Sequence, residues 1–254
     1  MNMKRKGILL ILLTVILAAA VPMEGKAMGN KIARLCEAIE KGDNEEAIRI
    51  AEGIRDLNAQ SSSFPWLVGL LEGEVTTPLV KACEKGNAVM IPWLLEHGAR
   101  VDYAPGDILY PLEIFCDSGS GAGKDVLQKL LDYGADPEKY KKRPPVFRLA
   151  QTLRHRKTDT MQAGVDMVLM LLDSGAAWQD PADGLTLIHY GALQTNGDFL
   201  GILLGRKEAA AFLNTENNKG QTPLDLAEQN GNAECVKILL EAGAKRGSGT
   251  QSAP

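Results

Sequence analysis

Apolar residues recur at helical spacing along most of the chain, and short polar breaks containing glycine separate one run from the next. In residues 31–54, Ile32, Leu35 and Ile39 fall on one helical face, and Gly42 interrupts the pattern before it resumes. This spacing predicts two short amphipathic helices joined by a turn. The outward positions of the pair are mainly charged, which is typical of the terminal unit of a helical stack. They are Glu37, Glu40, Glu45, Glu46, Arg49 and Glu52.

The start of the chain has a different pattern. A basic segment at residues 4–6 precedes an uncharged apolar run at residues 7–21, and Gly25 and Ala27 follow as small residues. The run is shorter than the ~20 residues that a transmembrane helix needs, so residues 1–27 are predicted to be a secretory signal peptide. An uncleaved N-terminal anchor is the alternative. With either, we expect an exported protein, periplasmic or secreted.

A further pattern, built on Thr-Pro-Leu and on Leu-Leu followed by Gly-Ala, recurs along the rest of the chain. Pro78 and Pro111 stand 33 residues apart in two successive copies. The interval of 41 residues between Gly134 and Gly175 predicts an insertion in the fourth repeat. The copies are Thr77–Leu79 with Leu94–Ala99, Tyr110–Leu112 with Leu130–Ala135, Pro144–Val146 with Leu171–Ala176, Gly184–His189, and Thr222–Leu224 with Leu239–Ala244.

These residues resemble the ankyrin repeat, in which a Thr-Pro-Leu-His start is followed by a glycine and by a Leu-Leu…Gly-Ala end. The resemblance covers about residues 30–246. It implies an all-α, ankyrin-like helical-repeat solenoid of about five repeats behind a partial N-terminal capping unit. Thr is expected to cap the first helix of a repeat, and Gly86 and Gly231 to end it in a left-handed conformation. The predicted domains are the signal peptide at 1–27, a partial repeat and apolar connector at 28–74, ankyrin-like repeats at 75–246 and a flexible tail at 247–254.

Composition narrows the range of partners. Of the 254 residues, 45% are hydrophobic and 24% are charged, which is close to the average of soluble proteins. Loss of residues 1–27 would remove four bases and one acid and leave 24 basic and 31 acidic residues, a net charge of −7. An acidic chain with 5% aromatic residues is poorly suited to nucleic acid. We also expect no membrane contact beyond the signal peptide, and a monomer.

Residue types that serve catalysis or metal binding stand at structural positions of the repeats. His189 occupies the His of the Thr-Pro-Leu-His start, where the resemblance implies local hydrogen bonding. Residues 118–125 lack the first glycine and the Ser/Thr of a phosphate-binding loop. We therefore expect no metal, no cofactor and no catalytic residues, and predict that the chain is not an enzyme. The cysteines fall in predicted helices that pack about 8–10 Å apart, so buried thiols are expected rather than disulfides. They are Cys36, Cys83, Cys116 and Cys235.

One segment differs in charge from the rest of the chain. Residues 139–157 contain eight basic residues and no acidic residue. The segment is either a solvated loop and insertion edge or a positive docking patch for an acidic partner surface. Three of its basic residues, Arg154, Arg156 and Lys157, lie in the predicted insertion.

The resemblance implies a non-catalytic protein–protein interaction module, because ankyrin-like repeats bind partners through their loops and their concave helix face. The predicted signal peptide adds the expectation that this module acts in the cell envelope. An immunity-type inhibitor of an envelope-acting toxin is one alternative, and an enzyme of unknown type is another. Tyr103 and Trp178 could either anchor the partner or pack against the next repeat. The candidate partner-binding residues are Tyr103, Asp107, Tyr140, Lys142, Arg143, Arg154, Arg156, Lys157, Trp178, Gln179, Asp183, Asn217 and Lys219.

Overall fold

A computed structural model describes most of the chain and shows a helical protein. It describes residues 23–61, 76–104, 106, 108–118, 123–153, 158–194 and 197–248, with the backbone alone at 23–30 and 158–160. The chain divides after Ile108 into two compact units. We call them unit 1 and unit 2 and describe each by itself.

Unit 1 contains two helix pairs. The first pair is α2 (Met23–Lys41) and α3 (Asn44–Ala51), and the second is α4 (Pro78–Lys85) and α5 (Met90–Glu96). Helix α2 packs against both α3 and α4. As predicted, Ile32, Leu35 and Ile39 are buried, while the outward charged residues of the first pair lie largely in solvent. This pair therefore has one apolar side against the stack and one polar side in water.

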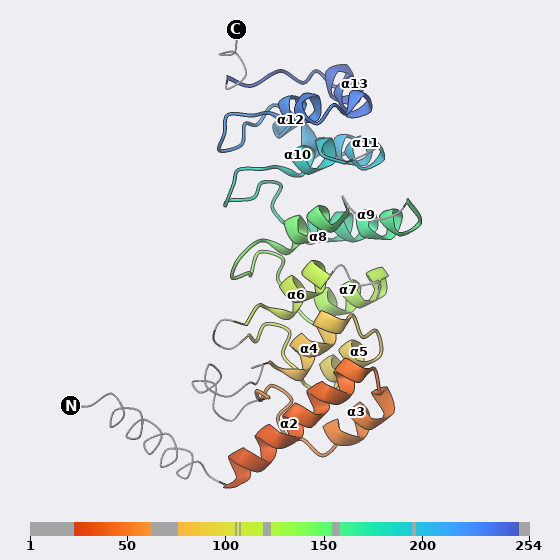
Figure 1. Ribbon diagram of the computed structural model, residues 1–254, viewed down its shortest axis with the longest axis vertical. Helices are drawn as coiled ribbons and strands as arrows, with labels where there is room; N and C mark the ends of the chain where they lie inside the picture. Colours follow the sequence, from red (N-terminus) through yellow and green to blue (C-terminus); the bar gives the residue numbers. More distant parts are fainter. Residues whose placement is uncertain are drawn as a thin grey trace, which may run out of the picture. The chain divides into compact units, whose positions relative to one another are not determined.

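Unit 2 repeats the same arrangement four times. In Figure 1 its helix pairs lie one above another, with the first helix of each pair on the side from which the connecting loops project. Helix α6 packs against α8, α7 against α9, and α10 against α12. The pairs are α6 (Pro111–Ser118) with α7 (Gly123–Asp132), α8 (Pro145–Leu153) with α9 (Thr158–Asp173), α10 (Leu187–Ala192) with α11 (Asp198–Leu204), and α12 (Pro223–Gln229) with α13 (Ala233–Glu241). A short 3-10 helix, η2 (Lys207–Ala211), follows α11. The predicted all-α repeat solenoid is thereby confirmed.

Helix ends follow the chemistry of the repeat pattern. The Thr77 hydroxyl accepts a hydrogen bond from the backbone N–H of Val80 at 3.3 Å, and proline follows as the first helical residue. Gly86 and Gly231 have φ of 59° and 66°, in the left-handed region where glycine is favoured. Both features agree with the sequence prediction.

The insertion predicted for the fourth repeat corresponds to a long second helix. Helix α9 has 16 residues, whereas α7, α11 and α13 have 10, 7 and 9. Figure 1 shows α9 extending beyond the helices above and below it in unit 2. The extra length therefore projects on the side opposite the loops.

The core consists of aliphatic and aromatic side chains together with the four thiols. The cysteines are all buried as thiols, as predicted. Burial raises the pKa of Cys116 well above its ordinary value and that of Cys235 to about 11. Such thiols stay protonated near neutral pH and act as small apolar residues.

Some predicted segments lie outside the described residues. These are most of the signal peptide (residues 1–22), part of the connector (62–75), the middle of the glycine-rich turn (119–122) and the end of the tail (249–254). Within the described part of the chain, no helix is both long enough and apolar enough to span a bilayer.

Candidate functional site

In unit 2, three buried polar side chains hold the loops against the first helices. They stand at the same position of the repeat, directly after the Thr-Pro-Leu segment or its equivalent. The Glu113 carboxylate accepts hydrogen bonds from the backbone N–H of Tyr110 at 3.1 Å, and from those of Lys141 and Lys142 in the following loop at 3.0 and 3.2 Å. Glu113 is fully buried, so these bonds satisfy a charge that water cannot reach.

His189 and Asp225 do the same in later repeats. His189 Nδ1 accepts from the Thr186 N–H at 3.0 Å, and its Nε2 donates to the Gln221 carbonyl at 3.0 Å. Burial lowers the pKa of His189, so the ring is neutral near pH 7. Asp225 accepts from the N–H groups of Thr222 and Gly247, both at 2.8 Å. Each residue thus joins the start of its helix to the next loop, and the local hydrogen-bonding role predicted for His189 is confirmed.

An ion-pair cluster connects two successive loops of unit 2. Arg143, just before α8, lies 2.5 Å from Asp180 through Nε and 2.5 Å from Asp183 through Nη2. The Asp180 side chain is fully buried, whereas those of Arg143 and Asp183 are 24% and 39% exposed. The cluster therefore fixes the loop before α8 to the loop before α10, and part of it faces solvent.

A groove of about 230 Å³ lies beside this cluster, and we call it the loop groove. It is formed by the first helices α8 and α10 and by the loops that precede them. Its lining combines polar side chains with two leucines, Leu185 and Leu193. The lining residues are Arg143, Gln151, Asp183, Leu185, Tyr190, Leu193 and Gln194.

Tyr190 is the most notable side chain of the loop groove. It is 6% exposed, and its ring packs against that of Phe147 with centroids 5.7 Å apart. Burial raises its pKa to about 12, so the hydroxyl is neutral. Among the described residues, no group forms a hydrogen bond with this hydroxyl. The oxygen is not among the buried side-chain atoms that have no partner, so although the ring is buried the hydroxyl is open to solvent and available to a ligand in the groove.

Several predicted partner-binding residues have contacts that support the loops of unit 2. Trp178 stacks on Phe212, with ring centroids 5.6 Å apart and planes 5° from parallel. Gln179 donates from its amide to the Gly184 carbonyl at 3.1 Å. Asn217 accepts from the backbone of its own turn. Of the two roles considered for Trp178, the structure shows packing against the following segment.

Other predicted residues are more open to solvent. Tyr103, in unit 1, is half-buried with the Arg100 guanidinium 5.5 Å from its ring centroid. Tyr140 is half-buried, and burial, followed by the charge of Glu138, raises its pKa. Lys142 and Lys219 are exposed. The remaining predicted residues lie outside the described part of the chain; they are Asp107, Arg154, Arg156 and Lys157.

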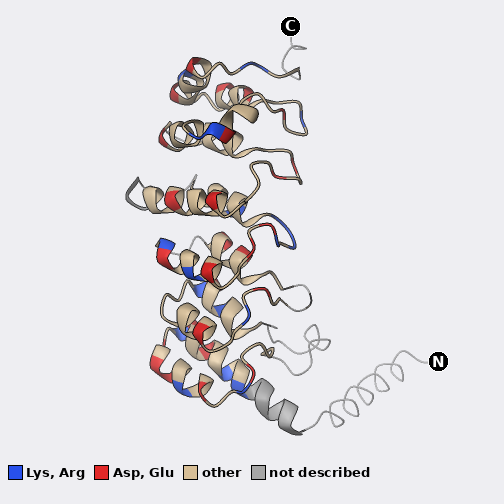
Figure 2. Ribbon diagram, turned by 180° about the vertical axis from the view of Figure 1, so that it is seen from behind, with Lys and Arg blue, Asp and Glu red and all other residues tan. Residues whose placement is uncertain are grey.

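The basic segment at residues 139–157 is partly neutralised within unit 2. Besides Arg143, Arg148 pairs with Asp117 at 3.0 Å and with Glu113 at 3.7 Å. The ammonium groups of Lys139 and Lys141 lie 5.1 and 5.3 Å from the centroid of the Tyr110 ring. Figure 2 shows the remaining run of positive charge on the loop that leads into α8. Of the basic residues that the structure describes in this segment, Arg143 and Arg148 therefore have their charges paired with carboxylates of unit 2.

Four residues of the loop groove were not predicted from the sequence: Gln151, Tyr190, Leu193 and Gln194. Gln151 and Tyr190 lie on the first helices α8 and α10, where their apolar neighbours identify a core face, and Leu193 and Gln194 directly follow α10. Tyr190 directly follows the His of the Thr-Pro-Leu-His start, and this position was the only sequence feature that could have identified it. The repeat pattern does not distinguish a core tyrosine from one with an accessible hydroxyl.

Comparison with known proteins gives a consistent result. A family model described as ankyrin repeats (3 copies) matches residues 160–248. The ankyrin repeat protein nuc-2 of Neurospora crassa is 27% identical over 189 residues, covering 73% of this chain and 16% of that protein. XBAT31 of Arabidopsis thaliana, which carries the name of an E3 ubiquitin-protein ligase, is 29% identical over 106 residues, covering 36% of this chain and 23% of that protein. The chain thus spans less than a quarter of the length of these relatives.

Proposed function

Since the chain belongs to the ankyrin-repeat family, we propose that it is a non-catalytic module that binds another protein through the loop groove of unit 2. Ankyrin repeats indicate a protein–protein interaction module, because stacked repeats present an extended surface of helices and loops. The observation that carries the proposal is Tyr190, which lines the loop groove and whose hydroxyl forms no hydrogen bond with another described residue.

The chemistry of the groove defines the partner segment. Leu185 and Leu193 give the groove apolar lining, and Gln151 and Asp183 give it polar groups. A loop or extended segment would place an apolar side chain against Leu185 and Leu193 and a hydrogen-bonding group near the Tyr190 hydroxyl. The ion pairs between Arg143 and the two aspartates hold the groove in place before the partner arrives, which lowers the entropy cost of binding.

The conservative variant Tyr190→Phe tests the proposal. It keeps the ring against Phe147 and removes the hydroxyl alone, so the folded state should lose little stability. We expect partner affinity to fall about five- to thirtyfold, which corresponds to one hydrogen bond of about 1–2 kcal/mol. Quantitative affinity capture, followed by calorimetric titration of the retained protein, measures the change.

Tyr133→Phe is the matched control. Tyr133 lies at the end of α7 with 42% of its surface exposed and does not line the loop groove. Its variant should retain the same partner at the wild-type level. Equal retention by wild type, Tyr190→Phe and Tyr133→Phe would show that the groove is not the binding surface.

We also propose that the chain acts after export, in the cell envelope or outside the cell. The support is the basic and apolar pattern of residues 1–27. When the full chain is expressed in a bacterial host, the exported protein should begin at Met28, as measured by intact mass. An unprocessed chain in the cytoplasmic fraction would contradict the proposal, and an unprocessed chain in the membrane would favour the anchor.

A further inference from the structure

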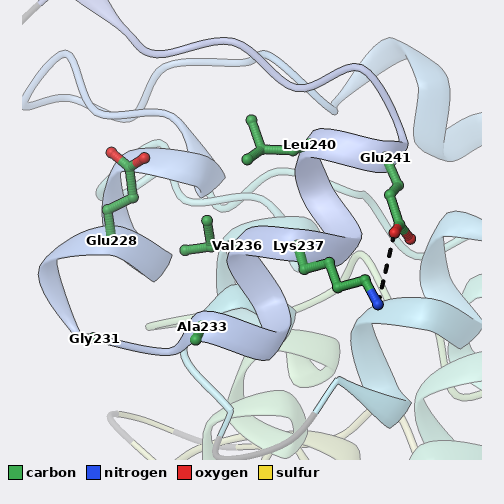
Figure 3. Close-up of a pocket in the computed structure, with 7 residues that line it drawn as sticks. All are labelled: Glu228, Gly231, Ala233, Val236, Lys237, Leu240 and Glu241. Atoms are coloured by element: carbon green, nitrogen blue, oxygen red, sulfur yellow. Dashed lines mark ion pairs between the residues drawn. The ribbon is translucent and has the colours of Figure 1, made fainter.

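The outer side of the last helix pair carries an apolar groove. It has a volume of about 540 Å³ and lies between the end of α12, the turn at Gly231 and helix α13. Figure 3 shows Val236 and Leu240 side by side on α13, with Glu228 across the groove and Lys237 paired to Glu241 on one flank. Leu240 is 52% exposed, one of the most exposed large apolar side chains in the described part of the chain. We call this surface the α13 face.

The α13 face has the composition of an interior surface. The position that Leu240 occupies in the last repeat is occupied by Leu95, Leu131 and Leu172 in earlier repeats. Leu95 is 2% exposed, Leu172 is 8% exposed and Leu131 is half-buried. Ile91, Leu127 and Val168, which correspond to Val236, are each fully buried. The last pair therefore keeps apolar residues at positions that are buried elsewhere. Exposed apolar surface of this kind marks an interaction site.

Two other parts of this chain are poor occupants for the face. Residues 249–254, Gly-Thr-Gln-Ser-Ala-Pro, contain no large aliphatic or aromatic side chain to cover Leu240. The outward side of the first helix pair carries exposed charges, including Glu37, Glu40 and Glu52. Head-to-tail stacking of copies would bury these charges against Leu240 at a high desolvation cost.

The charges around the α13 face are complementary to those on the same face of a second copy. Lys237 and Glu241 lie on one flank, 3.9 Å apart, with side chains 76% and 66% exposed. On the other side, Glu228 is paired with Arg246 at 2.6 Å, so the rim has two cations and two anions. When two helices pack antiparallel about a two-fold axis, residues on a given flank of one meet the same flank of the other. Lys237 of each copy would then approach Glu241 of its counterpart.

We propose that two copies of the chain associate through their α13 faces, with Val236 of one copy on Leu240 of the other. Such an interface is isologous, so it closes a dimer and does not propagate into a filament. It covers one helix pair, less than the ~800 Å² per partner of a stable complex, so the dimer is weak and depends on concentration. The proposal contradicts the monomer expected from the sequence, and it does not depend on the function of the loop groove.

Leu240→Glu tests the apolar contact. In the full chain, sedimentation equilibrium over a wide concentration range should show wild-type mass rising toward that of a dimer. Leu240→Glu should raise the dissociation constant at least about tenfold, because the dimer would bury an unpaired carboxylate. Val89→Glu is the matched control, since Val89 is also 52% exposed but lies in unit 1; it should associate like the wild type. Circular dichroism checks that each variant is folded.

A charge exchange tests the orientation. Lys237→Glu and Glu241→Lys should each weaken association, because each places like charges together across the two-fold axis. The double variant restores opposite charges and should regain most of the wild-type affinity. Tyr190→Phe should leave association unchanged.

Three results would overturn the dimer. They are a wild-type chain that stays monomeric at every concentration, a Leu240→Glu variant that associates as strongly as Val89→Glu, and a double exchange no better than either single change. A monomeric wild type whose partner capture is lost in Leu240→Glu would assign the face to another protein instead.

Discussion

Replacement of Glu113 by alanine is expected to lower the free energy of unfolding of unit 2 by about 3–5 kcal/mol, because it removes one partner from a buried charged network. Three backbone N–H groups, those of Tyr110, Lys141 and Lys142, would lose their acceptor inside the protein. Arg148, whose side chain is 10% exposed, pairs with Glu113 and Asp117 in the wild type and would keep only the pairing with Asp117. The loop before α8 should therefore open more readily than the helices around it.

The measurement for Glu113→Ala is hydrogen exchange followed by mass spectrometry, together with urea unfolding. Exchange should rise first in the peptide that contains Lys141 and Lys142. Asp117→Ala is the matched control, because Asp117 is 56% exposed and pairs with the same arginine; it should cost less than about 1 kcal/mol. Similar losses for the two variants would mean that the buried carboxylate has no special role in holding the loop.

Replacement of Phe147 by alanine is expected to have an effect of similar size. Phe147 is fully buried on α8, and a phenylalanine deleted from such a position costs about 3–5 kcal/mol through lost burial and the cavity left behind. Its ring also packs against that of Tyr190, with 5.7 Å between the ring centroids. The variant should therefore lower both the stability of unit 2 and the affinity of the loop groove for its partner.

Phe212→Ala is the control for Phe147→Ala, because it also removes an aromatic contact of unit 2 but not one beside Tyr190. Phe212 is half-buried and stacks on Trp178, so its removal should destabilise unit 2 clearly less than that of Phe147. Partner binding by Phe212→Ala should stay near the wild-type level under conditions where the protein is folded. If Phe147→Ala binds the partner normally while folded, the shape of the groove does not depend on this packing.

Helix pairs, their caps and their glycine turns were predictable because they depend on residues close together in sequence. Thr77 caps α4 through Val80, three residues away, and Gly86 ends the same helix. The buried thiols followed in the same way, since helical spacing places the cysteines on core faces. His189 was assigned to local hydrogen bonding because its position in the repeat carries that role.

The candidate site depended on contacts between residues far apart in sequence. Arg143 was counted in a positive docking patch, but it pairs with Asp180, 37 residues away. Trp178 was expected either to bind a partner or to pack, and its stack on Phe212 forms only when one loop reaches the next segment. A count of charges or aromatic residues along the chain contains no information on which of them meet.

The sequence by itself determined the repeat, its period and the capping of its helices, because each repeat uses nearly the same local chemistry. Tertiary structure alone decided which polar groups are already used within the protein and which apolar groups stay uncovered. The Tyr190 hydroxyl and the Leu240 side chain occupy ordinary core positions in the repeat pattern. Tyr190 lines a groove and Leu240 lies on the outer side of the last described helix pair, because burial depends on what stacks beside each repeat.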